Sequence, residues 1–190
     1  MLTVVGFPRS GTNFLTRMLA HYVDGPDAET WDGMGTHPHV RKIHWAYQDY
    51  GLTTFVYIYR DPRDCALSGW KYINHHYVPS VTLMEFLEHY FAGHWPLWPT
   101  GWREHARYWL GRDLPTVSYE SLCVDREGVL RDLMVKLHGA VNEEHLAHAV
   151  SESYNIGERH DGRWVSDLPA EAAAWLDEYC GDLIPVLGCP

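Results

Sequence analysis

The segment GFPRSGTNF, residues 6–14, places Gly6 and Gly11 around a short loop directly after an apolar run. Residues 2–5 are apolar or β-branched and predict a strand. From Leu15 onward, apolar residues recur at the spacing of a helix. A loop between a strand and a helix directs backbone N–H groups and the positive end of the helix dipole at one point. The segment therefore predicts a phosphate-binding site at the start of the first helix.

This loop differs from a triphosphate-binding P-loop at the positions that handle the γ-phosphate. Such loops continue after the second glycine with Lys and then Ser or Thr, whereas this chain has Thr12 and Asn13. Its basic residue, Arg9, stands earlier, inside the turn. The loop thus favours a phosphate compound other than a magnesium-bound triphosphate. An ordinary strand–turn–helix connection with two glycines is the alternative.

A second transition from strand to helix follows at residues 53–77. Residues 53–59 (TTFVYIY) are β-branched and aromatic, which favours a buried strand. Pro62 and the acidic residues beside it are typical of a helix N-terminus. Arg60 at the end of the strand and Ser68 on the helix are therefore candidates for binding one anion. Solvated arginines beside a helix start are the alternative.

Taken together, these segments resemble the sulfotransferases that use 3′-phosphoadenosine 5′-phosphosulfate. Residues 7–14 are similar to the family's 5′-phosphosulfate loop, and residues 59–68 to its 3′-phosphate motif. Between them, residues 41–44 (RKIH) are similar to a Lys-x-His element whose histidine is the catalytic base. Residues 101–122 follow in the family's order and spacing, and the rest of the chain resembles the family weakly.

The resemblance implies a role for each matching residue. His44 would take the proton of the acceptor hydroxyl, while Lys42 and Arg9 would stabilise the transferring group. The implied cofactor-binding set is Arg9, Ser10, Gly11, Thr12, Asn13, Phe14, Arg60, Ser68, Tyr119, Arg159 and Gly162. Sulfuryl transfer resembles phosphoryl transfer in needing positioning and cationic stabilisation. Because no triphosphate leaves, we expect no metal, and the product would be adenosine 3′,5′-bisphosphate (PAP).

Three positions depart from the family pattern. Arg9 stands where many cytosolic members have Lys, and Phe14 stands where Trp commonly stacks on the adenine. Phe14 keeps an aromatic face at that position, although a smaller one than Trp would present. Residues 159–164 (RHDGRW) are a contracted form of the glycine-rich segment that closes over the 3′-phosphate, with Arg159 and Gly162 as its equivalents.

Composition is consistent with one enzyme domain. The 190 residues are 46% hydrophobic, and the formal charge of −10 argues against a nucleic-acid or anionic-membrane partner. The four cysteines lack metal or redox spacing. No stretch of about 18 apolar residues and no export leader occurs, so we expect a cytoplasmic protein. We expect a single domain over residues 1–190, a monomer or weak homodimer. Its predicted fold is α/β, P-loop-like and three-layered, with a central parallel sheet flanked by helices.

The acceptor is defined less closely by the sequence. Aromatic residues in segments that can surround a pocket favour a small phenol or alcohol, and a sugar stays open. They are Trp31, Trp45, Tyr47, Trp70, Trp95 and Trp98. His37 and His39 are further candidates for acceptor contact, and the pair His145 and His148 is expected to be solvated because zinc-site spacing is missing. A P-loop small-molecule kinase and a nucleotide-binding family member without turnover remain alternative functions.

Overall fold

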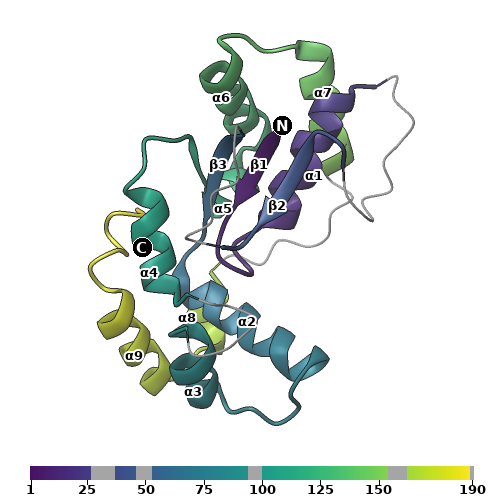
Figure 1. Cartoon of the computed structure of the whole chain (residues 1–190). Helices are drawn as coiled ribbons and strands as arrows, with labels where there is room; N and C mark the ends of the chain where they lie inside the picture. The colour runs from purple at the N-terminus through teal and green to yellow at the C-terminus, as the bar shows by residue number, and fades with distance from the viewer. Residues whose placement is uncertain (27–36, 46–52, 94–99, 154–161, 189–190) are drawn as a thin grey trace.

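The computed structural model describes residues 1–26, 37–45, 53–93, 100–153 and 162–188. Its centre is a four-stranded sheet in the order β2-β1-β3-β4, and each neighbouring pair is parallel (Figure 1). The strands are β1 (Leu2–Val5), β2 (Val40–Ile43), β3 (Thr54–Tyr59) and β4 (Thr116–Ser118). The predicted α/β fold with a central parallel sheet is confirmed.

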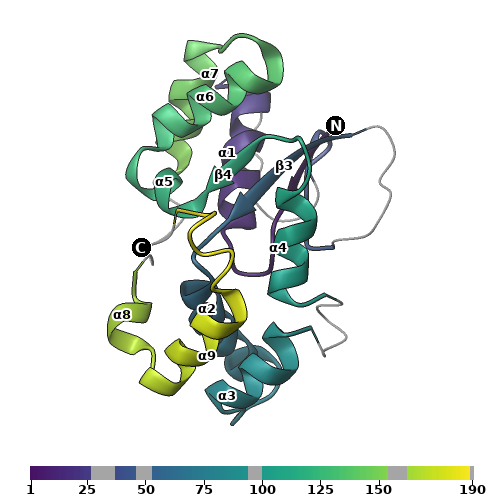
Figure 2. The same cartoon turned by 90° about the vertical axis from the view of Figure 1, so that its left-hand side faces the viewer.

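The helices lie on both faces of the sheet and below its carboxyl ends. Their bounds are α1 (Thr12–Asp24), α2 (Pro62–His76), α3 (Leu83–Phe86), α4 (Trp102–Leu110), α5 (Tyr119–Val124), α6 (Arg126–His138), α7 (Glu143–Ser153), α8 (Trp164–Asp167) and α9 (Ala170–Cys180). Figures 1 and 2 show α1, α6 and α7 against one face, α4 against the other, and α2, α3, α8 and α9 beneath. The molecule thus has three layers at the sheet. None of the helices in these described ranges is long and apolar enough to cross a membrane.

Three apolar clusters hold these layers together. The largest on the sheet packs β1, β3 and β4 against α1, α6 and α7, with Val4, Leu15 and Leu130 fully buried. On the opposite face, Tyr57 stacks on Trp109 of α4 with ring centroids 6.4 Å apart. A third cluster joins α2, α3, α4 and α9 below the sheet. Apolar burial on this scale is the main driving force of folding.

Local sequence signals explain where two helices begin. Asp61 precedes α2, and its side chain accepts the Arg63 N–H at 2.8 Å, with Pro62 at the first helical position. Thr82 and Glu85 form a capping box at the start of α3. The helix therefore starts at Leu83, and it continues as a π-helical turn over Leu87–Phe91.

The strand β2 was not predicted from the sequence. Its sequence is VRKI: the apolar residues at the two ends are buried, and the two charged residues in the middle are more exposed. Among the described strands β2 pairs with β1 alone, so it lies at the edge of this sheet, and an edge strand needs no continuous apolar run. This pairing places the RKIH segment beside the glycine loop.

Candidate active site

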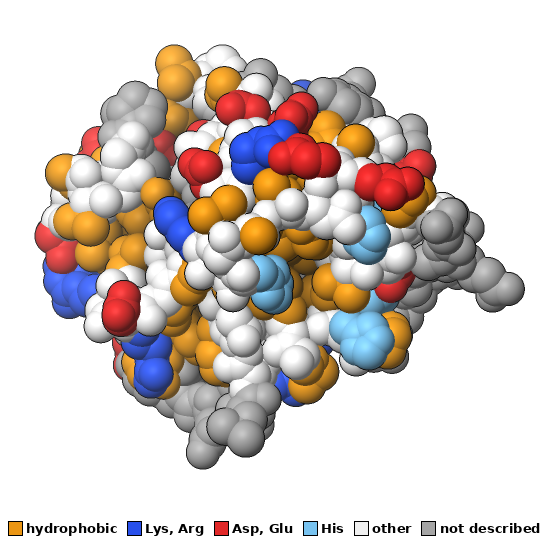
Figure 3. Space-filling view, turned by 90° about the horizontal axis from the view of Figure 1, so that it is seen from above, with side chains coloured by type: hydrophobic (Ala, Val, Ile, Leu, Met, Phe, Trp, Pro, Cys, Tyr) orange, Lys and Arg blue, Asp and Glu red, His pale blue; other side chains and the backbone are white. Residues whose placement is uncertain are grey.

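Four segments meet at the carboxyl edge of the sheet. Since all strands are parallel, the chain leaves β1 into the glycine loop, β2 into His44, β3 into Arg60 and β4 into Tyr119 at one edge. Ligands of open parallel sheets bind at this edge. Figure 3 shows the other end of the molecule, where acidic and histidine side chains gather. The phosphate motifs predicted from the sequence are thus brought together.

The glycine loop is a tight turn that leads into α1. Arg9 and Gly11 both have left-handed backbones, with φ of 74° and 94°. A Cβ atom on Gly11 would lie 2.4 Å from the Tyr119 ring, so this position requires glycine for its conformation and for space. The first N–H groups of α1 have no acceptor within the helix and are directed at the loop. Thr12 and Asn13 are the first two helical residues.

The side chain of Ser10 is bonded within the glycine loop. Its Oγ donates to the Phe7 carbonyl at 2.7 Å and approaches the Ile58 carbonyl at 3.3 Å. Its backbone N–H also bonds the Phe7 carbonyl, at 3.1 Å. Ser10 therefore shapes the loop from inside, through both its hydroxyl and its backbone N–H.

His44 is held by the same loop. Its Nδ1 lies 2.8 Å from the Gly6 carbonyl oxygen. A carbonyl oxygen can only accept a hydrogen bond, so Nδ1 carries the proton and the neutral ring keeps its lone pair on Nε2. This tautomer is the one that a general base at Nε2 requires. Lys42, two residues earlier, donates to the Asn13 side-chain oxygen and so joins β2 to the start of α1.

Positive charge is concentrated around His44. Burial lowers the pKa of His44, the Gly6 hydrogen bond opposes this shift, and Lys42 and Arg9 lower the pKa further. The pKa of Lys42 is itself lowered, first by burial and then by Arg17 and Arg9. Such mutual repulsion between cations is relieved when an anion binds. The sequence motifs assign no role to Arg17, although it lies one helical turn after Asn13.

Arg60 and Arg9 meet on the other side of the loop. Arg60 is 5% exposed, donates to the Arg9 carbonyl at 3.3 Å and lies 4.6 Å from the centroid of the Tyr119 ring. Arg9 donates from Nε to the Ser68 hydroxyl at 3.1 Å and lies over the Tyr72 ring. The predicted 3′-phosphate residues Arg60 and Ser68 are therefore brought together with Arg9.

A pocket of about 310 Å³ opens beside these residues. Its lining consists of Arg9, Arg60, Asp64, Leu67, Ser68, Lys71, Tyr72, His75, His76 and Arg163. Several of these residues were not predicted. Among them, Asp64 and Tyr72 lie one helical turn before and after the predicted Ser68, on the same face of α2. Four of these ten residues are Arg or Lys and one is an acid, and this excess of positive charge suits a phosphate group.

Aromatic side chains border the glycine loop on its far side. Phe14 and Tyr119 meet edge to face, with centroids 6.3 Å apart, and both are half-buried. Arg126 of α6 lies 5.2 Å from the centroid of the Phe14 ring. Half-buried rings beside a phosphate loop can stack on a planar base. Arg126 could not be foreseen because it lies far along the chain.

Several other residues that the sequence predicted for the site make different contacts or lie outside the described residues. Trp70 donates its indole N–H to the Val81 carbonyl at 2.8 Å, and Trp45 is 45% exposed. His37 bonds Asp24 at 3.0 Å at the amino end of β2, away from His44. Arg159, Trp31, Tyr47, Trp95 and Trp98 lie outside the described residues, while the Gly162 N–H bonds Asp64. The pair expected to be solvated instead contacts α1, through His145 on the Tyr22 carbonyl and His148 on His21.

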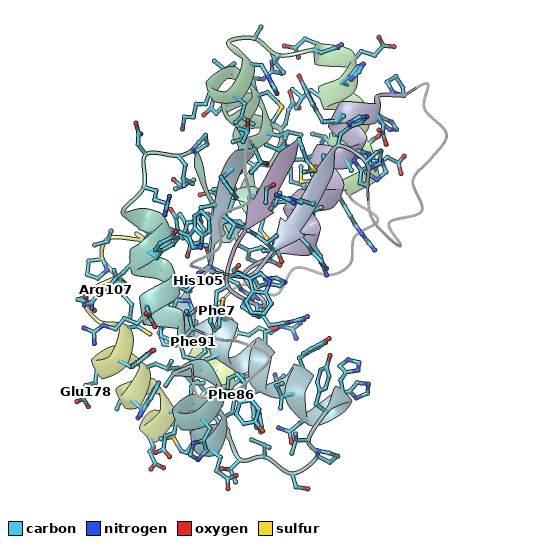
Figure 4. All side chains as sticks on the ribbon, in the orientation of Figure 1. Phe7, Phe86, Phe91, His105, Arg107 and Glu178 are labelled. Atoms are coloured by element: carbon cyan, nitrogen blue, oxygen red, sulfur yellow. The ribbon has the colours of Figure 1, made fainter. Side chains whose placement is uncertain are left out.

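His105 of α4 is a buried histidine whose ring nitrogens have no hydrogen-bond partner within the described ranges. Its ring packs edge-on against Phe7, with centroids 5.7 Å apart (Figure 4). The His105 ring also lies 5.8 Å from the centroid of the Tyr57 ring. Burial lowers the pKa of His105 to about 3, and the charge of His44 contributes in the same direction. The folded protein therefore resists protonation of His105.

We expect His105 to make the fold sensitive to acid. Its pKa is about 3 in the folded state, so below pH 6.5 the unfolded chain binds a proton that the folded chain does not. Stability then falls as the pH decreases, by about 3 kcal/mol at pH 4 relative to pH 7. His105→Leu should remove this part of the loss in urea unfolding at the two pH values. Equal acid losses in His105→Leu, wild type and the exposed control His138→Leu would contradict this role.

Comparisons with known proteins agree with this arrangement. A family model described as the sulfotransferase domain matches residues 52–155, more than half of the chain. A mouse sulfotransferase complexed with PAP superposes with a TM-score of 0.73 at 18% identity, covering 96% of this chain and 83% of that one. Retinol dehydratase in complex with androsterone and the inactive cofactor PAP gives 0.71 at 17% identity, covering 96% and 80%. A putative steroid sulphotransferase of Arabidopsis thaliana gives 0.66 at 16% identity, covering 100% and 78%.

The two kinds of comparison carry different weight. At these identities the solved structures show a shared fold, and no curated protein sequence matches the chain. The family model rests on the sequence itself and spans β3 to the end of α7. It includes the segment of Arg60 and Ser68 and the segment of Tyr119. By this match the chain is an enzyme that belongs to the sulfotransferase family.

Proposed function

We propose that the protein transfers a sulfuryl group from 3′-phosphoadenosine 5′-phosphosulfate to a hydroxyl of a small acceptor. The observation that carries this proposal is the Nδ1 hydrogen bond of His44 to Gly6. This bond holds His44 beside the glycine loop that leads into α1 and leaves the lone pair on Nε2, as the proposed base requires. A phenol or alcohol is the favoured acceptor, and a sugar is the second candidate.

The side chains and backbone fit this cofactor. The 5′-phosphate suits the N–H groups of Thr12 and Asn13 at the start of α1. The 3′-phosphate suits Arg60 and Ser68, which line the cationic pocket. The adenine suits the half-buried face formed by Phe14 and Tyr119. When bound, the cofactor supplies an activated sulfuryl group.

The protein's own residues then act on protons and charge. His44 takes the hydroxyl proton of the acceptor at Nε2 as the oxygen attacks, and its Nδ1–H stays on the Gly6 carbonyl. Lys42 and Arg9 oppose the negative charge that develops around the transferring group. Arg9 also joins the two phosphate sites, because its Nε bonds the Ser68 hydroxyl. No step in this scheme requires a metal ion.

A transfer assay tests the proposed reaction. Purified protein is incubated with ³⁵S-labelled cofactor and separate panels of phenols, alcohols and sugars, with His44→Asn run in parallel. A labelled sulfate ester that depends on His44 is the expected product. If the wild-type protein binds PAP yet labels no acceptor in any panel, the proposal of turnover is contradicted and nucleotide binding alone is favoured.

The ionisation of His44 gives a prediction of pH dependence. Because burial, Lys42 and Arg9 lower its pKa, the imidazole should be neutral at pH 7 and should titrate below pH 6.5 in the cofactor-free protein. Bound PAP should move the midpoint upward, since an anion favours the imidazolium. Nuclear magnetic resonance titration of the ring protons, assigned with His44→Asn, measures both values. A midpoint at or above 6.5 without PAP would contradict this assignment.

A further inference from the structure

A carboxylate lies in the wall of the cationic pocket. Asp64 is 2% exposed and lines the pocket together with Arg60 and Arg163. Burial raises its pKa, against the opposing effects of the Gly162 N–H, Arg60 and the Trp164 N–H. A negative charge at this place repels a phosphate, so its presence needs a physical reason other than direct contact with the ligand.

The oxygens of Asp64 are occupied by a segment far along the chain. The Gly162 N–H donates to Oδ2 at 2.5 Å, and the Trp164 N–H donates to Oδ1 at 3.1 Å. Arg60 lies 3.8 Å from Oδ2. Hydrogen bonds from backbone N–H groups to a buried carboxylate are among the stronger ones in proteins. Asp64 therefore fastens residues 162–164 to the first turn of α2.

The neighbouring Arg63 supports the same contact. Its guanidinium lies 3.7 Å from the centroid of the Trp164 ring. Two hydrogen bonds to Asp61, of 2.9 and 2.6 Å, fix its orientation. A third attachment, between Lys71 and Asp167, is an exposed ion pair, and such pairs contribute little. The docking of this segment thus depends mainly on Asp64 and Arg63.

We propose that Asp64 is a positioning residue for cofactor binding, which docks residues 162–164 on α2 and so holds Arg163 in the 3′-phosphate pocket. The proposal rests on the proposed function and assigns a further residue to its cofactor site. Arg163 lines the pocket between the two amides that Asp64 holds.

The substitution Asp64→Asn separates this role from simple electrostatics, because the two predict opposite signs. If charge alone mattered, removing a carboxylate from an anion pocket would tighten PAP binding. If Asp64 positions the segment, its amide cannot accept from both N–H groups, and the Kd for PAP should rise about tenfold or more. The Kd for adenosine 5′-phosphate should change less than about twofold. Asp182→Asn, which removes an exposed carboxylate that pairs with Arg103 and Arg107 outside the pocket, is the matched control.

Hydrogen exchange tests the docking itself, in the cofactor-free protein. The amides of Gly162 and Trp164 should exchange about tenfold faster in Asp64→Asn than in wild type or in Asp182→Asn. Arg163→Gln, which leaves α2 untouched, should weaken PAP binding to a similar degree, and the double variant should lose little more. Unchanged exchange, unchanged PAP affinity in Arg163→Gln, or tighter PAP binding in Asp64→Asn would each overturn the proposal. Equal wild-type affinity for PAP and adenosine 5′-phosphate would instead refute the cofactor assignment, and the exchange result still decides the docking.

Discussion

His44→Asn should abolish sulfuryl transfer while leaving PAP binding intact. An Asn side chain can donate from its amide to the Gly6 carbonyl, as Nδ1 of His44 does, but it has no equivalent of the basic Nε2. Loss of a general base costs about 10²–10⁴-fold in rate. We expect kcat to fall by this factor, with the Kd for PAP within about twofold of wild type by calorimetry.

Two further variants make this result specific. His44→Ala should lose the same activity and should also loosen the glycine loop, because it removes the hydrogen bond to Gly6. His138→Ala changes an exposed histidine at the end of α6 and should leave transfer unchanged. Parallel loss of transfer and PAP binding in His44→Asn would show that His44 is structural, which would contradict its assignment as the base.

Arg60→Ala should selectively weaken binding of the 3′-phosphorylated nucleotide. Arg60 is buried beside Ser68 and Arg163 in the pocket, and a guanidinium can bind phosphate through two parallel hydrogen bonds. Its loss should raise the Kd for PAP about a hundredfold, with a much smaller change for adenosine 5′-phosphate. Calorimetric titration of both nucleotides measures this difference.

The chemistry of this contact can be examined with two more arginine variants. Arg60→Lys keeps the charge without the fork geometry and should recover only part of the lost affinity. Arg107→Ala removes an exposed arginine of α4 that pairs with Asp182, outside the pocket, and should have no effect. If Arg60→Ala preserved the wild-type preference for PAP over adenosine 5′-phosphate, Arg60 would not be the 3′-phosphate residue.

Local sequence signals predicted the parts of the fold that depend on neighbouring residues. The strand at residues 2–5, the glycine loop and the helix beginning at Pro62 are confirmed, because turn chemistry and apolar periodicity act over a few positions. The edge strand β2 was missed because a short, partly polar strand needs its partner β1 to be recognised. The π-helical turn at Leu87–Phe91 likewise left no signal in the periodicity.

In the candidate site, too, local motifs were predictable from the sequence and contacts between distant residues were not. Arg60 and Ser68 follow from one strand-to-helix motif, and the structure places both in one pocket. The contact of Tyr119 with Gly11 and the docking of Gly162 on Asp64 join residues about a hundred positions apart. Contacts of this kind depend on the sheet order and on helix packing, which a single sequence does not reveal.

The most direct test of the central claim is calorimetric titration of the protein with PAP, compared with adenosine 5′-phosphate and with ATP plus Mg²⁺. The cationic pocket around Arg60 and the absence of Lys from the glycine loop predict a clear preference for PAP over both. Preference for ATP with Mg²⁺ would contradict the sulfotransferase account and favour a kinase. No binding of any of the three would indicate a family member that has lost its cofactor site.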